Sequence, residues 1–268
     1  MTEKLPEKEL ETILAALIDG TRLVLGQNLL GAYLGGSFAH GGWDAYSDVD
    51  FNIVIDQDLR PSELDPLRVV HARIFTMDCY YARHLEGSYF PKAILQSLDL
   101  TEEPVWYLDN GSLNFERSTH DNTLVNRWVL RERGVILTGL DPEVWIPPVP
   151  EDLFKAEIFD TMRTWGGEII AGQYKIDNRW AQAFAVLSYC RMLHSLATGE
   201  VGSKPDGAGW AVEALDRKWR PLIEDALSAR VNQYAKVYQP ADSDKVQGTL
   251  AFIRYALRQA AKVAEEGR

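Results

Sequence analysis

The sequence predicts a mixed α/β N-terminal region followed by an all-helical C-terminal region. Up to about residue 140, short apolar runs rich in β-branched residues alternate with segments of helical spacing. Beyond about residue 150, the apolar residues keep a helical period almost throughout. The stretch between them, LDPEVWIPPVP, holds four prolines in eleven residues, which the interior of a helix or a sheet does not tolerate. We therefore expect two domains, residues 1–145 and residues 146–268.

The individual elements follow from local patterns. Apolar residues at helical spacing predict a first helix over residues 6–25, and two apolar runs predict strands over residues 31–34 and 51–55. The remaining N-terminal expectations are a helix over 65–70, a strand over 75–81, a helix over 89–98, a strand over 105–108 and a helix over 123–133 capped by Asp121 or Asn122. The C-terminal region predicts helices over 151–172, 178–198, 208–216, 219–236 and 243–266.

Composition excludes several classes of protein. The formal net charge of −11 disfavours binding to a nucleic-acid backbone, which requires clustered lysine and arginine. No apolar run reaches the ~18 residues of a membrane span, and the acidic N-terminus does not resemble a secretory signal. Two cysteines fit a reducing compartment. We expect a cytoplasmic protein with no nucleic-acid or membrane partner; the oligomeric state stays open, with a monomer favoured.

Two aspartates at the start of the second strand suggest a metal site. Side chains alternate along a strand, so Asp48 and Asp50 point the same way, and two neighbouring carboxylates repel unless a cation lies between them. Oxygen ligands of this kind suit Mg²⁺, which takes further ligands from substrate phosphates. Gly36 and Ser37 lie in a turn that follows the preceding strand and can offer backbone N–H groups and a hydroxyl to phosphate. Together these groups are suited to in-line displacement at phosphorus.

Gly36-Ser37 followed by Asp48-x-Asp50 resembles the signature of the nucleotidyltransferase superfamily, which includes DNA polymerase β-like enzymes and antibiotic nucleotidyltransferases. A third carboxylate from the next strand is then expected to take a proton from the attacking hydroxyl. Asp78, in FTMDCYY, is the leading candidate for this base, with a third metal ligand as its other possible role. Glu86, a few residues further on, is the competing candidate.

Longer motifs resemble the streptomycin/spectinomycin (3″)(9)-adenylyltransferases. They are WVLRERGVILTG (128–139), PPVPEDLF (147–154) and YCRMLHSLATGEVGSKPDGAGWAVEAL (189–215). The resemblance implies an N-terminal nucleotidyltransferase domain and a C-terminal helical bundle that completes the ATP and acceptor sites. It also implies that Arg191 and Lys204 bind the nucleotide phosphates, a role in which two cations neutralise the triphosphate and the departing pyrophosphate.

The acceptor site is less fully matched to that family. The resemblance implies a tryptophan and acidic residues there, for which Trp106, Asp177 and Glu86 are the nearest matches. Carboxylates and an aromatic ring suit a cationic drug. The family pattern also has a second acidic residue and an asparagine before the arginine. This chain has Ala181 and Phe184 at those positions, which weakens the case for streptomycin itself.

The resulting hypothesis is Mg²⁺-dependent transfer of AMP from ATP to a hydroxyl group of an aminoglycoside-type antibiotic, with release of pyrophosphate. Its expected partners are Mg²⁺, ATP and a cationic drug of the streptomycin/spectinomycin class. Two alternatives stay open. One is the same chemistry on a different small molecule, protein or RNA, and the other is a non-catalytic binder of nucleotide or drug.

Overall fold

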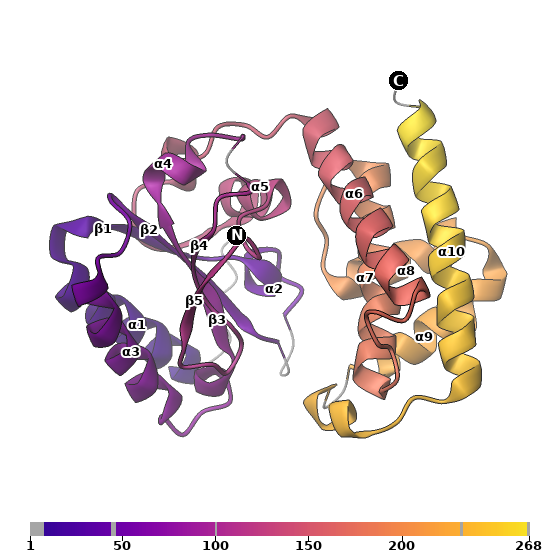
Figure 1. The fold of residues 1–268 in the computed structure, drawn as a ribbon, viewed down its shortest axis with the longest axis horizontal. Helices are drawn as coiled ribbons and strands as arrows, with labels where there is room; N and C mark the ends of the chain where they lie inside the picture. The colour runs from indigo at the N-terminus through magenta and orange to yellow at the C-terminus, as the bar shows by residue number, and fades with distance from the viewer. Residues whose placement is uncertain (1–7, 44–46, 100, 231–232, 267–268) are drawn as a thin grey trace. The chain divides into compact units, whose positions relative to one another are not determined.

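The computed structural model describes residues 8–43, 47–99, 101–230 and 233–266, and the chain divides into two compact units. The first unit ends at Val149 and contains the sheet, and the second begins at Pro150 and is helical (Figure 1). This arrangement confirms the predicted fold class, a mixed sheet with helices followed by a helical region. Each unit is described below by itself.

The N-terminal unit is built on a six-stranded sheet with the strand order β5-β4-β3-β2-β1-β6. The strands are β1 (Leu29–Leu34), β2 (Val49–Ile55), β3 (Leu85–Pro91), β4 (Val105–Leu108), β5 (Phe115–Ser118) and β6 (Val135–Gly139). β2 and β3 pair in parallel, and the other neighbouring pairs are antiparallel. A parallel pair needs a long crossover connection, which here contains helix α3 (Pro61–Phe75). The crossover places the first residues of β2 and β3 at the same end of the sheet.

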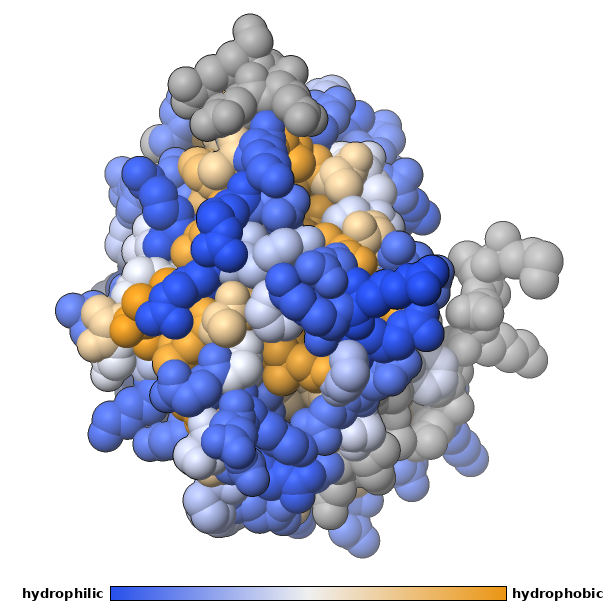
Figure 2. Space-filling view, turned by 90° about the vertical axis from the view of Figure 1, so that its right-hand side faces the viewer, coloured by the Kyte–Doolittle hydropathy of each residue, from blue (hydrophilic) through white to orange (hydrophobic). Residues whose placement is uncertain are grey.

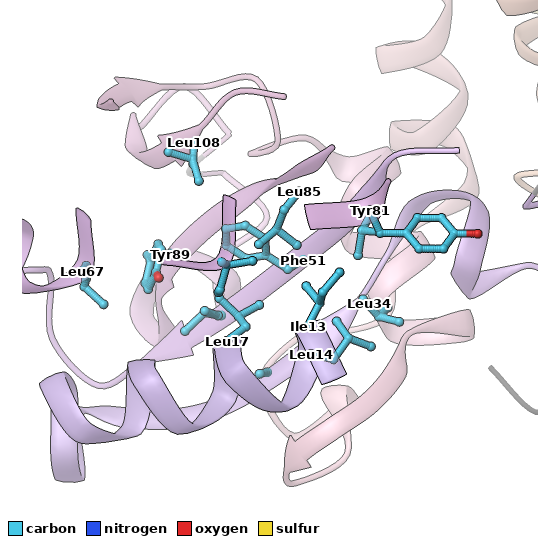
Figure 3. Packing of buried hydrophobic residues seen from close by; sticks show 14 of the residues in the cluster. Ile13, Leu14, Leu17, Leu34, Phe51, Leu67, Tyr81, Leu85, Tyr89 and Leu108 are labelled. Carbon is cyan, nitrogen blue, oxygen red and sulfur yellow. The ribbon is translucent and has the colours of Figure 1, made fainter. Parts of the chain in front are cut away.

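One face of this sheet is covered by α1 (Lys8–Leu25) and α3, which pack beside each other. Leu10, Ile13, Leu14 and Leu17 recur at helical spacing on α1 and are fully or almost fully buried. They meet alternate residues of β2, among them Phe51 and Ile53, in the larger hydrophobic cluster of the unit (Figure 3). Because side chains alternate along a strand, the residues between them point to the opposite face.

The opposite face is apolar at one end and polar at the other. Val54 of β2 and Phe90 of β3 pack with Leu130 of α5 (Leu124–Arg133) in a second, smaller cluster. Towards the start of both strands the same face carries Asn52 and then Asp50. The change from apolar to acidic along one face locates the candidate site at the start of β2 and β3.

The structure corrects two predicted elements in this unit. Residues 75–81 do not form a strand, because α3 continues to Phe75 and a turn and a short 3₁₀ helix follow it. Leu67, His71 and Ile74 are buried at helical spacing and explain the longer helix. The helix predicted over residues 89–98 is also wrong. Residues 89–91 complete β3, and α4 is confined to Lys92–Leu95.

The C-terminal unit is helical, as predicted. Its α-helices are α6 (Glu151–Ile170), α7 (Arg179–Thr198), α8 (Lys204–Ala214), α9 (Arg220–Ser228) and α10 (Ser243–Glu266). α7 is the most buried of them, and it contacts α6, α8, α9 and α10. The face of the molecule in Figure 2 is largely hydrophilic, with small hydrophobic areas between the polar side chains. In the part of the chain that the structure describes, no helix has the length and apolar character needed to cross a bilayer.

Candidate active site

Three carboxylates gather where β2 and β3 begin. Asp48 immediately precedes β2, and Asp50 is the second residue of that strand. Glu86 is the second residue of β3, and the parallel register pairs it directly with Asp50. Paired residues on neighbouring strands project to the same face of a sheet. The structure therefore groups Asp48 and Asp50, the predicted metal ligands, with Glu86 rather than with Asp78.

Asp78 lies outside this group because the strand predicted around it does not exist. It is exposed in the turn that follows α3. A surface hollow at this turn is lined by Asp78, Glu9, Arg83 and His84, together with Cys79 and Tyr80. The alternation in FTMDCYY resembled a strand, whereas the strand that supplies the neighbouring carboxylate begins at Leu85.

The turn after β1 approaches the Asp50 side chain closely. The backbone N–H of Gly35 donates a hydrogen bond to the carbonyl oxygen of Asp50 at 2.9 Å. Gly36 begins the short helical turn α2 (Gly36–Ala39) and has a φ of +50°, a conformation that residues with a Cβ rarely adopt. A Cβ built on Gly36 would overlap the carboxylate of Asp50. Glycine is required at this position by both the backbone conformation and the available space.

The environment of Glu86 favours proton transfer. Burial raises the pKa of Glu86 to about 7, a hydrogen bond from Tyr107 lowers it, and the negative charges of Asp121 and Asp48 raise it. The Tyr107 hydroxyl donates to Oε1 of Glu86 at 2.7 Å, and Nε2 of His120 lies 3.7 Å from the same oxygen. A carboxylate that titrates near neutral pH is suited to general acid–base chemistry.

A hydrogen-bonded network surrounds the carboxylates on the same face of the sheet. Ser88 Oγ donates to Oδ2 of Asp121 at 2.7 Å, and burial raises the pKa of that aspartate. The side-chain amide of Asn126 donates to Oδ1 of Asn52 at 3.0 Å and to the backbone carbonyl of Asp121 at 2.9 Å. The hydroxyl of Thr123 accepts a hydrogen bond from the backbone N–H of Asn126 and caps α5. The prediction that Asp121 or Asn122 caps this helix was therefore wrong.

The chemistry of the group fits a divalent cation. Asp48, Asp50 and Glu86 offer hard oxygen ligands on one face, which is the donor type that Mg²⁺ prefers. Glu86 also belongs to a second set with His120 and Asp121, whose potential ligand atoms all lie within 4.8 Å of one another. This second set has no signal in the sequence, because Glu86 lies on β3 whereas His120 and Asp121 lie in the loop between β5 and α5, where Asp121 was expected only as a helix cap.

Trp106 is not brought together with the carboxylates. It lies on β4 between Val105 and Tyr107, and its side chain packs against the larger hydrophobic cluster on the α1 and α3 side. The guanidinium of Arg117 stacks over its ring at 5.4 Å. Tyr107, the next residue, is the aromatic side chain of β4 that faces Glu86.

The C-terminal unit holds the remaining predicted residues. Arg191 lies on α7, and Lys204 is the first residue of α8, whose N-terminus is capped by Ser203 and Asp206. A Cβ on Gly207 would collide with the backbone of Arg191, so this glycine allows close packing of α8 on α7. Asp177 is exposed just before α7, and its carbonyl oxygen accepts a hydrogen bond from the backbone of Ala241 at 2.8 Å.

Phe184, where the related pattern has a polar residue, lies against Lys204. The ammonium nitrogen of Lys204 lies 4.6 Å from the centre of the Phe184 ring. The ring of Trp180 stacks on that of Phe184, with the ring centroids 5.0 Å apart. These three side chains, together with Leu187 and Arg230, line a small pocket within the unit.

Both parts of the chain are similar to known aminoglycoside and spectinomycin adenylyltransferases. Residues 145–258 match the family model described as aminoglycoside adenylyltransferase, C-terminal domain. The aminoglycoside (3″)(9) adenylyltransferase of Shigella flexneri is 26% identical over 277 residues, which cover 95% of this chain and 96% of that protein. The spectinomycin 9-adenylyltransferase of Campylobacter jejuni is 22% identical over 244 residues, covering 88% of this chain and 90% of that protein.

A solved structure extends the comparison to the fold. The crystal structure of spectinomycin adenyltransferase AAD(9) from Enterococcus faecialis with ATP and spectinomycin superimposes with a TM-score of 0.69. The alignment covers 94% of this chain and 99% of that chain, at 16% sequence identity. The two proteins therefore share a fold.

Proposed function

We propose, from the similarity of this chain to aminoglycoside adenylyltransferases, that it transfers AMP from ATP to a hydroxyl group of an aminoglycoside-type antibiotic. The acceptor is a drug of the streptomycin/spectinomycin class, and pyrophosphate is released. The observation that carries the reaction is the direct pairing of Asp50 with Glu86 beside Asp48. Such a group of carboxylates serves a phosphoryl-type transfer and has no evident use in a simple binder.

Each residue of this site has a distinct role in the proposal. Asp48 and Asp50 hold Mg²⁺, which when bound supplies positive charge at the phosphates. Glu86 replaces Asp78 as the proposed base, and it accepts the proton of the attacking hydroxyl as the bond to the α-phosphorus forms and the bond to pyrophosphate breaks. The backbone of Gly36 and the hydroxyl of Ser37 bind phosphate.

The C-terminal domain completes the site in this proposal. Arg191 and Lys204 bind the phosphates of ATP and stabilise the leaving pyrophosphate, as guanidinium and ammonium groups do in other phosphoryl-transfer sites. Asp177 contacts a cationic group of the drug. Trp106 is not retained as an acceptor contact, because its ring packs on the other face of the sheet. We retain the expectation of a cytoplasmic protein, and the oligomeric state stays open with a monomer favoured.

Pyrophosphate release tests the proposal directly. Purified protein is incubated with Mg·ATP and, separately, with streptomycin, spectinomycin and several 2-deoxystreptamine drugs, with Asp50→Asn as the control. Release with one drug, abolished by the substitution, supports both the reaction and the acceptor class. If ATP binds but no drug elicits release, the antibiotic is the wrong acceptor, and another hydroxyl compound or macromolecule takes its place. Ala181 and Phe184 are the positions that favour such an alternative acceptor.

A further inference from the structure

The end of β4 contacts two of the three carboxylates. Tyr107 pairs with Ser88 across β3 and β4, which places its side chain on the same face as Glu86. Its hydroxyl lies 2.7 Å from Oε1 of Glu86 and 3.1 Å from Oδ1 of Asp109. Burial and the nearby negative charge of Glu86 raise the pKa of Tyr107, so this hydroxyl remains a proton donor. Since it has one hydrogen, the shorter contact identifies Glu86 as its main acceptor.

Asn110, two residues after β4, contacts Asp48 in a comparable way. Its side-chain nitrogen donates to Oδ1 of Asp48 at 2.7 Å. Its side-chain oxygen lies 3.0 Å from Nδ1 of His84, a contact that requires the hydrogen on Nδ1 because an amide oxygen only accepts. The His84 ring is in turn packed on the Tyr80 ring, with centroids 4.3 Å apart. The amide is therefore fixed from both sides, and its nitrogen must face the carboxylate.

These two contacts occupy one oxygen of each carboxylate. The donor at Oε1 fixes the orientation of the Glu86 carboxylate, and the donor at Oδ1 fixes the orientation of the Asp48 carboxylate. Neighbouring carboxylates repel and tend to turn apart when no cation is present. Hydrogen bonds from a rigid element oppose that rotation and hold the ligands in a geometry ready for the metal.

We propose that Tyr107 and Asn110 are positioning residues, with Tyr107 orienting Glu86 as the base and Asn110 orienting Asp48 as a metal ligand. The inference rests on the proposed adenylyl transfer and extends it to a strand that carries no reacting group. The segment from Tyr107 to Asn110 then contributes to catalysis by holding the Glu86 and Asp48 side chains in their working orientations.

The test compares two variants with matched controls. Tyr107→Phe removes a buried hydroxyl that faces Glu86, and Tyr89→Phe removes a buried hydroxyl on the opposite face, where it contacts Nε2 of His71 at 2.9 Å. Asn110→Ala is matched by Asn28→Ala, since Asn28 hydrogen bonds to the backbone of Gln57 away from the carboxylates. Urea unfolding of all four variants corrects for any loss of stability.

We expect Tyr107→Phe to lower kcat about tenfold or more while leaving KM for ATP and the affinity for Mn²⁺ unchanged. We expect Asn110→Ala to weaken Mn²⁺ binding about 10- to 100-fold, the usual effect of removing a group that orients a metal ligand. Electron paramagnetic resonance of free Mn²⁺ in the presence of ATP measures that affinity without turnover. Both control variants should behave as the unmodified chain in both assays.

Two results overturn the inference: kcat of Tyr107→Phe equal to that of Tyr89→Phe, or Mn²⁺ affinity of Asn110→Ala equal to that of Asn28→Ala. A different result would show that the proposed function itself is wrong. In that case the unmodified chain releases no pyrophosphate with any drug, and the Mn²⁺ comparison, which needs no acceptor, still decides whether Asn110 orients Asp48.

Discussion

Asp50 and Glu86 are direct partners in the parallel register of β2 and β3, one on each strand and both on the same face. Because the crossover through α3 brings the beginnings of both strands to one end of the sheet, these carboxylates are fixed by backbone pairing in the core of the unit. Backbone pairing fixes the positions of their Cα atoms, so the two carboxylates can separate only by side-chain rotation. The metal-free fold therefore holds acidic side chains of both strands at one end of the sheet.

Substituting each candidate base in turn tests whether the proton acceptor is Glu86, as the structure indicates, or Asp78, as the sequence pattern indicated. We expect Glu86→Gln to lower kcat by about 10²- to 10⁴-fold, the usual contribution of a general base, with ATP still bound. Asp78→Asn should retain nearly full activity, because Asp78 is exposed in the turn after α3 and is not part of the carboxylate group on β2 and β3. Steady-state pyrophosphate release measures both. A severe loss in Asp78→Asn with an active Glu86→Gln would restore the assignment made from the sequence.

Substituting Gly36 should affect the site more than the fold. Gly36→Ala imposes the strain of a positive φ, about 1 kcal/mol, and also forces the Asp50 carboxylate aside. Gly26→Ala is a matched control, because Gly26 has a φ of +54° and a Cβ there meets nothing within 4 Å. Both variants should lose similar stability in urea unfolding. Gly36→Ala alone should lose Mg²⁺-dependent turnover, and equal activities would show that Gly36 is required only for its backbone conformation.

The raised pKa of Glu86 predicts the pH dependence of the metal-free protein. Its ordinary value is 4.5 and its value in the fold is about 7, so the folded state binds a proton more tightly than the unfolded state. The resulting stabilisation is present at acid pH and is lost as the pH rises through 7, and it amounts to about 3 kcal/mol. Glu86→Gln should remove this difference between pH 5 and pH 8, measured by urea unfolding in a chelator.

The effect of added Mg²⁺ on the Tm at two pH values tests the same carboxylates. At pH 8 Glu86 has lost its proton, and a divalent cation offsets the resulting negative charge, so added Mg²⁺ should raise the Tm more at pH 8 than at pH 5. Asp48→Asn combined with Asp50→Asn serves as the control, because it removes the proposed ligands. A rise in Tm that is the same at both pH values, or that persists in the double variant, would show that the ion binds elsewhere.

The aromatic ring beneath Lys204 should contribute to ATP binding. Phe184→Asn removes the ring face that lies 4.6 Å from the ammonium nitrogen, and a cation–π contact contributes about 0.5–2 kcal/mol. We expect KM for ATP to rise about threefold to tenfold, whereas Phe184→Tyr, which keeps the ring, should preserve it. Isothermal titration with a non-hydrolysable ATP analogue separates binding from turnover. An unchanged affinity in Phe184→Asn would remove the ring from the nucleotide site.

Sequence patterns were most reliable for long or continuously apolar segments. The run from Phe51 to Ile55 lies within β2, and the helices expected over 151–172, 178–198 and 243–266 correspond to α6, α7 and α10, whereas the helix expected over 219–236 ends at Ser228. The pattern failed between residues 75 and 91, where Phe75 ends α3, Tyr80 lies in the turn that follows, and Tyr81 is buried in a 3₁₀ helix rather than in a strand. Short apolar runs have the same composition in these structures, so only the packing partners distinguish them.

The site was predictable only in part for the same reason. Asp48 and Asp50 were identified together because they flank Val49, the first residue of β2, whereas Glu86 was identified only as a competing candidate because its position depends on the register between strands far apart in sequence. The start of α8 at Lys204 was missed, although Ser203 and Asp206 form a capping box there. Contacts of Tyr107 and Asn110 have no sequence signal, since they arise from the pairing of β4 with β3.

The close approach of Gly36 to Asp50 also constrains the evolution of this chain. A side chain at position 36 is compatible with the fold only if the carboxylate at position 50 is lost or displaced. The two positions are therefore expected to change together among descendants of this gene, with the loss of the aspartate first releasing the constraint on the glycine. A descendant with a larger residue at position 36 can be recognised from its sequence as a protein that has abandoned catalysis, even where the rest of the fold persists.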